Sequence, residues 1–272
     1  MRIGNGNLRP AFRAMLAMML LGWTANPVAA NDLYRTRSIV TGQGEENRLV
    51  GFAACLEDVL IKVSGAIRLA GDSRLLPYKS VARDFVLAYD YRDQKGGRPK
   101  NDEQGTRDRS FDLIVEFDEK RIDAVLLALG VKPWLSRRPV LGVFVEMEQG
   151  ARKYAVTADS AQTDLPRAAL AAAADKRGMS ILLPDIAMLE RLGCNCPAPV
   201  PYPALAEALS ERGAEVLVLG RLIWSDAELM WRAEWRLEWQ GQSHEWSFPA
   251  TTFDEAFRRG LGEAAQIVAS QP

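Results

Sequence analysis

The sequence predicts an α/β (α+β) protein with two small mixed-sheet domains that follow an export signal. Three observations carry this prediction: an apolar leader, two regions in which strand and helix periodicities alternate, and a short hinge between them. The chain has 272 residues, 48% hydrophobic and 25% charged, which is an ordinary globular composition with length for two small cores. The predicted division is 1–30 signal peptide, 31–133 N-terminal domain and 134–272 C-terminal domain.

The first 30 residues predict a secretory signal peptide. Arg2, Arg9 and Arg13 precede the apolar run 14–23, which is too short to span a bilayer. Small residues then predict cleavage after Ala30. We therefore expect a periplasmic protein with no transmembrane anchor after signal cleavage. The net charge of −1 argues against a nucleic-acid partner, because binding phosphates needs a basic surface.

Strand and helix patterns alternate in the N-terminal domain. The expected elements are a strand at 33–40, a helix ending at Gly65, a short helix at 77–82, a strand at 85–92, a polar loop at 93–109, a strand at 111–117 and a helix from Asp118 to Gly130. The helix before Gly65 has Phe52, Leu56 and Leu60 on one face, and glycine is a common helix stop. Asp118 is a suitable cap for the following helix.

The C-terminal domain is expected in the order β-α-β-α-β-β-β-α. The expected elements are strand 140–145, a helix capped by Asp164 and ending at Gly178, strand 179–183, helix 202–212, strands 215–224, 230–239 and 243–248, and a helix after the capping box of Thr252 and Glu255. Residues 230–239 alternate strictly. Trp231, Trp235 and Trp239 share one face, which we interpret as a core face rather than as an aromatic binding platform.

No catalytic, cofactor-binding or metal site is predicted. His244 stands alone and cannot form a typical zinc site without further ligands. Residues 71–73, Gly-Asp-Ser, are similar to the serine block of a small esterase class but lack its downstream Asp and His spacing. Asp112, Glu116 and Asp118 share a strand face, as on any solvated edge, and nothing pairs an acid with a base.

The cysteines are the one chemically unusual feature. Cys194 and Cys196 form a CxC motif, and in an exported protein we expect a local disulfide between them with no redox role. Thiol exchange through this pair is the alternative. Cys55 falls near the apolar stripe of a helix and is interpreted as a buried small hydrophobe.

The central region carries a family resemblance. Gly65 at the end of a helix, then Trp134, Arg138 and Pro139 before an apolar strand, resemble the domain-of-unknown-function 2066 (DUF2066) family of bacterial exported proteins over about residues 33–183. This resemblance implies an exported protein and gives these four residues a structural role. It brings no known activity.

The C-terminal half is similar to the N-terminal domain of TolB. The resemblance rests on strand 140–145, two helices and the run 213–220 before a hairpin and a helix. It implies an envelope protein that acts through partners. We therefore expect a non-catalytic envelope accessory protein that binds another cell-envelope protein. The alternative is a small-ligand-binding protein or enzyme with a pocket between the two halves. The sequence names neither partner nor oligomeric state.

Overall fold

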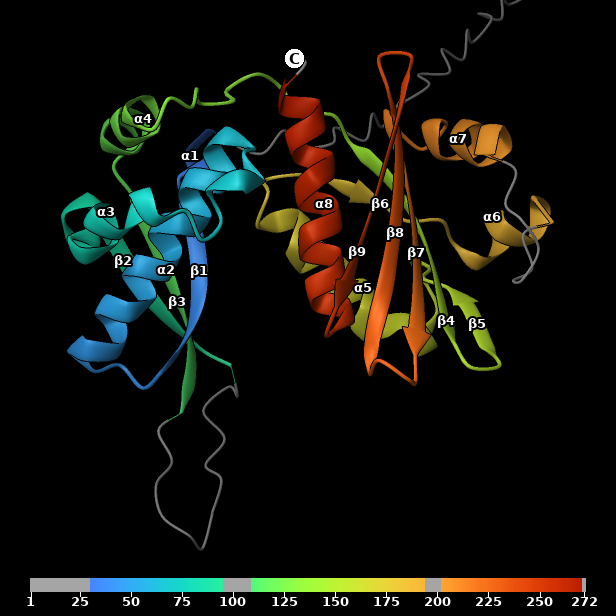
Figure 1. The fold of residues 1–272 in the computed structure, drawn as a ribbon, viewed down its shortest axis with the longest axis horizontal. Coiled ribbons are helices and arrows are strands. Elements are labelled where there is room, and N and C mark those ends of the chain that lie inside the picture. The colour runs from blue at the N-terminus through green and yellow to red at the C-terminus, as the bar shows by residue number, and fades with distance from the viewer. Residues whose placement is uncertain (1–29, 95–108, 194–201, 271–272) are drawn as a thin grey trace, which may run out of the picture.

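The computed structural model describes residues 30–94, 109–193 and 202–270, which form two sheets covered by helices (Figure 1). The mixed α/β fold class is confirmed. Within the described residues, no helix is both long and apolar enough to cross a bilayer.

The N-terminal half is a three-stranded sheet with helices packed on one face. Its elements are α1 (Ala30–Leu33), β1 (Arg35–Thr41), α2 (Glu45–Ser64), α3 (Leu76–Ser80), β2 (Val86–Asp93), β3 (Ser110–Phe117) and α4 (Glu119–Ala128). The strand order is β1-β3-β2, with both pairs antiparallel. Helix α2 buries Phe52, Leu56 and Leu60 against the sheet residues Leu113 and Val115, which gives this half its own core.

The C-terminal half is a six-stranded mixed sheet. Its elements are β4 (Leu141–Gln149), β5 (Arg152–Ala155), α5 (Asp164–Asp175), β6 (Ile181–Leu182), α6 (Ile186–Arg191), α7 (Tyr202–Ser210), β7 (Val216–Ser225), β8 (Met230–Trp239), β9 (Gln242–Ala250) and α8 (Phe253–Ser270). The order is β5-β4-β7-β8-β9, with β6 beside β4. Strands β4 and β7 are parallel, and β7, β8 and β9 form an antiparallel meander.

The two faces of this sheet are covered unequally. Helices α5 and α8 bury one face, where Trp231 and Trp235 of β8 join the largest core. Helices α6 and α7 lie on the opposite side (Figure 1). There Phe144 and Leu217 pack with Leu205 of α7. The α6–α7 side carries polar residues along β8, because that strand alternates buried and exposed positions. Much of the second face therefore stays open.

The strictly alternating strand 230–239 was predicted with its observed bounds, but several expectations were wrong. The meander contains the predicted hairpin, while the second half gains two elements, β5 and α6, that the predicted order lacks. Both are short and carry weak periodicity, so local pattern gives little signal. Asp164 is the first helical residue and not the cap, because a 3-10 turn at 161–163 precedes it. Most of the predicted polar loop lies outside the described residues.

The capping predictions have mixed outcomes. Asp118 caps α4 by accepting a hydrogen bond from the Arg121 N–H at 3.0 Å, as expected. Thr252 accepts from the Glu255 N–H at 3.2 Å, which is half of the predicted capping box. The Glu255 carboxylate turns to Thr251 instead, because it accepts from both the backbone N–H and the hydroxyl of that residue.

Candidate functional site

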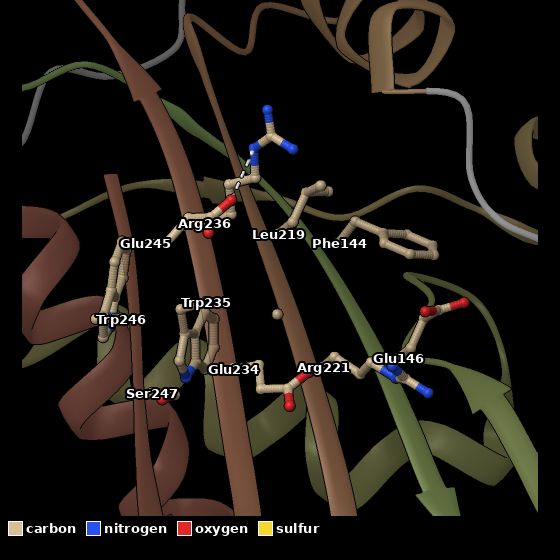
Figure 2. A pocket seen from close by; sticks show the side chains of 11 residues that line it. Phe144, Glu146, Leu219, Arg221, Glu234, Trp235, Arg236, Glu245, Trp246 and Ser247 are labelled. Carbon is tan, nitrogen blue, oxygen red and sulfur yellow. Dashed lines mark ion pairs between the residues drawn. The ribbon is translucent and has the colours of Figure 1, made fainter. Parts of the chain in front are cut away.

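A groove lies on the open face of the six-stranded sheet (Figure 2). Its volume is about 560 Å³, and it crosses β4, β7, β8 and β9. Strand register arranges its side chains in two rows across the sheet, because directly paired residues share a face. The rows are Phe144–Leu219–Arg236–Glu245 and Glu146–Arg221–Glu234–Ser247. We call these eight residues the open-face groove.

Ion pairs fix the charges at the groove. Arg236 donates from Nε and Nη2 to Oε1 of Glu238, at 3.0 and 2.7 Å. Its Nε lies 3.8 Å from Oε1 of Glu245, a weaker contact on the next strand (Figure 2). The guanidinium also lies 5.4 Å from the ring centre of Tyr202 on α7. Arg221 donates to Glu148 at 3.2 Å. The groove therefore presents alternating fixed charges beside an apolar end.

These contacts determine the protonation states at the groove. The hydrogen bond between Arg236 and Glu238 raises the pKa of the arginine and lowers the pKa of the carboxyl group. A hydrogen bond from Lys153, reinforced by Arg221, lowers the pKa of Glu148. Arg236, Glu238 and Glu148 therefore carry full charge near neutral pH. These three groups are held in ion pairs, which disfavours proton transfer by them near neutral pH.

The predicted tryptophan face packs in the core with α8, although Trp235 and Trp246 also border the groove. Trp231 and Trp235 are buried and Trp239 is half-buried, so this face belongs to the core, as predicted. The Trp235 ring stacks on Trp246 of β9 at 6.5 Å between centres. His244 is on the same side of β9, opposite Leu237. Among the described residues, no three His, Cys, Asp or Glu side chains form a group that could hold a metal.

A second, smaller pocket lies between the two halves. Its volume is about 290 Å³, and residues of β1, α2, β2, β3 and the end of α5 line it. Lys62 is buried in its wall and donates to the carbonyls of Asp32 and Arg35, at 2.7 and 3.0 Å. Burial lowers the pKa of this lysine. Lys176 on the other half pairs with Asp58 at 2.9 Å. This is the position of the alternative pocket expected from the sequence.

Three of the four motif residues meet where the halves join. The Arg138 guanidinium lies over the Trp134 ring at 4.3 Å and donates to the carbonyls of Lys62 and Arg177. Gly65 has a left-handed conformation with φ of 71°, and a side chain there would meet Trp134 at 3.0 Å. Pro139, which directly follows Arg138 in the sequence, is also buried. We call Gly65, Trp134 and Arg138 the junction cluster.

The cysteines separate into two cases. Cys194 and Cys196 lie outside the described residues, so their predicted disulfide stays a prediction. Cys55 on α2 is a free, fully buried thiol, and burial raises its pKa from 9.0 to about 12. A thiol with such a pKa is a poor nucleophile near neutral pH.

The other candidates from the sequence have structural roles. Asp72 caps a short 3-10 helix and binds the Arg74 side chain, so the Gly-Asp-Ser segment is a capped turn. Asp118 caps α4, and Asp112 accepts a hydrogen bond from Gln94 at 2.7 Å.

Sequence reasoning missed the open-face groove. The polar residues of 230–239 were recognised as one face, but their neighbours come from distant strands. The one available signal was that Arg221 and Glu146 interrupt otherwise apolar strands.

The fold and groove define a mixed α/β protein with an open, charged sheet face. A family model described as "Domain of unknown function (DUF8605)" matches residues 28–135, which is the N-terminal half. No curated protein and no solved structure matches the chain.

This match corrects the family expectation. The resemblance to the DUF2066 family was wrong, because the matching model is a different domain of unknown function. The DUF8605 match ends at residue 135, so Arg138 and Pro139 fall outside it, whereas Gly65 and Trp134 fall within it. The similarity of the second half to TolB belonged to the same expectation and is not carried further.

Proposed function

We propose that this protein is an exported, non-catalytic accessory protein that binds another cell-envelope protein through its open-face groove. The observation that carries the proposal is the groove itself: an open, concave sheet face with fixed charges of both signs beside Phe144 and Leu219. Protein interfaces combine an apolar centre with a polar rim in this way. The periplasmic location rests on the signal-like leader of residues 1–30.

The groove suits a protein partner better than a small molecule. Its basic side chains are about half exposed and pair with acidic neighbours, as Arg236 does with Glu238 along β8 and Arg221 does with Glu148 across strands. Small-ligand sites are instead enclosed and mostly apolar, with a few convergent polar groups. Exposed charges of this kind direct encounter and specificity between proteins.

Photo-crosslinking in cells tests this proposal. A photoreactive amino acid is placed at Ser247, inside the groove, and at the exposed Leu127 of α4 as the matched control. We expect Ser247 to capture one envelope protein reproducibly and Leu127 not to capture it. Capture of that protein equally from both sites, or from neither, would reject the proposal.

The pocket between the halves supports a second candidate, the binding of a small anionic molecule. It is lined by five basic and three acidic side chains. Arg35, Arg37 and Arg92 among them form no side-chain hydrogen bond or ion pair with the described residues. A ligand that binds only the folded protein raises its melting temperature. The test is therefore a thermal-shift titration with phosphate and dicarboxylates, repeated on Arg37→Ala, which should lose any response.

A further inference from the structure

We propose that the free edge of β9 pairs with an extended partner segment in which a basic residue lies between two apolar residues. This inference rests on the proposed function and specifies the partner chemistry of the same face. Strand β9 ends the sheet order, so its outer side has no strand neighbour among the described residues. Edge strands with unpaired backbone groups accept a further strand from another chain.

Two observations show which β9 residues direct their backbone outward. The β8–β9 turn consists of Gln240 and Gly241, both at positive φ, which is a two-residue turn whose flanking residues Trp239 and Gln242 pair by hydrogen bonds. The backbone N–H and C=O groups of the even-numbered β9 residues therefore point towards β8. At the other end, Pro249 has no N–H, and its carbonyl accepts from Arg259 of α8 at 3.0 Å. The backbone N–H and C=O groups of the odd-numbered residues therefore point away from the sheet.

The free edge consequently runs from Ser243 to Ser247. Ser243, Glu245 and Ser247 each direct one backbone N–H and one C=O away from the sheet, and all three are exposed. Arg259 and Pro249 close the far end, which limits pairing to this stretch. Figure 1 shows β9 at the border of the sheet, with its turn projecting beyond the neighbouring strands.

The charge at the centre of this edge selects the partner. Glu245 keeps unused acceptor capacity, because Arg236 donates at shorter distances to Glu238 and lies 3.8 Å from Glu245. Its side chain is 70% exposed. A residue directly opposite Glu245 shares its face of the sheet, and an opposite charge there stabilises the strand pair. A lysine or arginine fits this position.

The same charge argues against a second copy of this chain. Two β9 edges pairing antiparallel across a two-fold axis, centred on this stretch, would place Glu245 directly opposite Glu245. Like charges in that position are destabilising. A different protein with a basic residue is therefore the fitting occupant.

The residues on either side of that basic position face α8. They lie beside His244 and Trp246, which are half-buried on that side of β9. Aromatic side chains pair well with β-branched neighbours across strands. The segment that fits is therefore apolar, basic, apolar, with small polar residues opposite Ser243 and Ser247.

The test is a titration of the full chain with two synthetic peptides, observed by backbone amide NMR. One peptide is acetyl-Thr-Val-Lys-Val-Thr-amide, and the other has Glu in place of Lys. We expect the amide chemical shifts of Ser243, Glu245 and Ser247 to change most on binding. We expect the Lys peptide to bind about tenfold more tightly than the Glu peptide. Glu245→Lys should reverse this preference, while Glu263→Lys on α8 should leave it unchanged.

Failure of this inference is distinguishable from failure of the proposed function. Equal binding of both peptides, no binding, or a preference that Glu245→Lys leaves unchanged would overturn the edge-pairing inference. The crosslink from Ser247 to an envelope protein would still stand as support for the groove. Loss of that crosslink would instead reject the proposed function.

Discussion

At the residue scale, one arginine satisfies backbone groups from both halves. Arg138 donates to carbonyls at the end of α2 and just after α5, where helix ends carry partial negative charge. Burial lowers its pKa to about 10, which still leaves the guanidinium charged near neutral pH. The flat face of the group lies over Trp134. No other side chain offers this combination of planar stacking and several donors.

Arg138→Ala should therefore destabilise the protein by about 3 kcal/mol, because buried carbonyls lose charged donors. The neighbouring Arg137 provides a matched control. It pairs with Glu215 but is 72% exposed, so solvent screens the pair and Arg137→Ala should change the free energy of unfolding far less than Arg138→Ala does. Urea unfolding measures both values. Similar losses for the two variants would contradict the role assigned to Arg138.

The buried thiol of Cys55 makes the free energy of unfolding depend on pH in the alkaline range. Its pKa is about 12 in the folded protein and 9.0 ordinarily, so the native state holds this proton more tightly. The resulting stabilisation is complete below about pH 9 and is lost as pH rises towards 12, by at most about 1.4 kcal/mol per pH unit. The free energy of unfolding, measured with urea at pH 8, 9 and 10, should decline less steeply with pH for Cys55→Ala than for the wild type. Parallel slopes for the two proteins would refute this assignment.

At the element scale, α8 packs closely against β8 because the helix has a glycine at the contact. Gly260 of α8 lies on the Trp235 ring, and an added Cβ would be 2.1 Å from that ring. Gly220 of β7 leaves space for the same ring, where an added Cβ would be 2.8 Å away. The tryptophan therefore lies between a helix and a strand that both lack a side chain at the contact.

Gly260→Ala tests this fit. Alanine normally stabilises a helix interior by about 1 kcal/mol relative to glycine. Here overpacking should dominate and cost about 2–3 kcal/mol, because the ring is held between two elements. Arg258→Ala on the exposed side of α8 is the control and should stay within about 0.5 kcal/mol. Thermal unfolding compares them, and a stabilised Gly260→Ala would disprove the contact.

The same elements show what sequence can and cannot predict. Strand 230–239 was predictable because one face contacts a core and the other contacts water, which imposes period two. The groove was not, because its rows depend on pairing between β4, β7, β8 and β9. The junction residue Arg138 was noticed through a family resemblance, although that family was wrong. Its contacts with two helix ends depend on tertiary packing, which leaves no periodic pattern in the sequence.

At the scale of the whole molecule, the two cores are tied together by α8 and the junction cluster. Gly65 at the end of α2 lies against Ala269 of α8, where an added Cβ would be 2.7 Å away. The N–H of Arg68 donates to Gln266 of α8 at 3.3 Å, and Lys176 pairs with Asp58 across the same boundary. The predicted division at residue 133 separates the two sheets but crosses these contacts.

We therefore expect the halves to unfold in one cooperative transition. The described tryptophans all lie at or after Trp134, so their fluorescence reports mainly on the second half. Far-UV circular dichroism reports on both halves. The two signals should coincide on heating the wild type and separate in Arg138→Ala. Two resolved transitions in the wild type would show that the halves fold independently.

The placement of α8 also constrains the order in which the molecule can be completed. The strands of the six-stranded sheet are all synthesised before residues 253–270, yet the face with Trp231 and Trp235 is covered largely by this helix. Until the helix docks, the nascent sheet exposes its most aromatic surface. Because transiently exposed apolar surface promotes aggregation, docking of α8 is the step that protects the completed sheet.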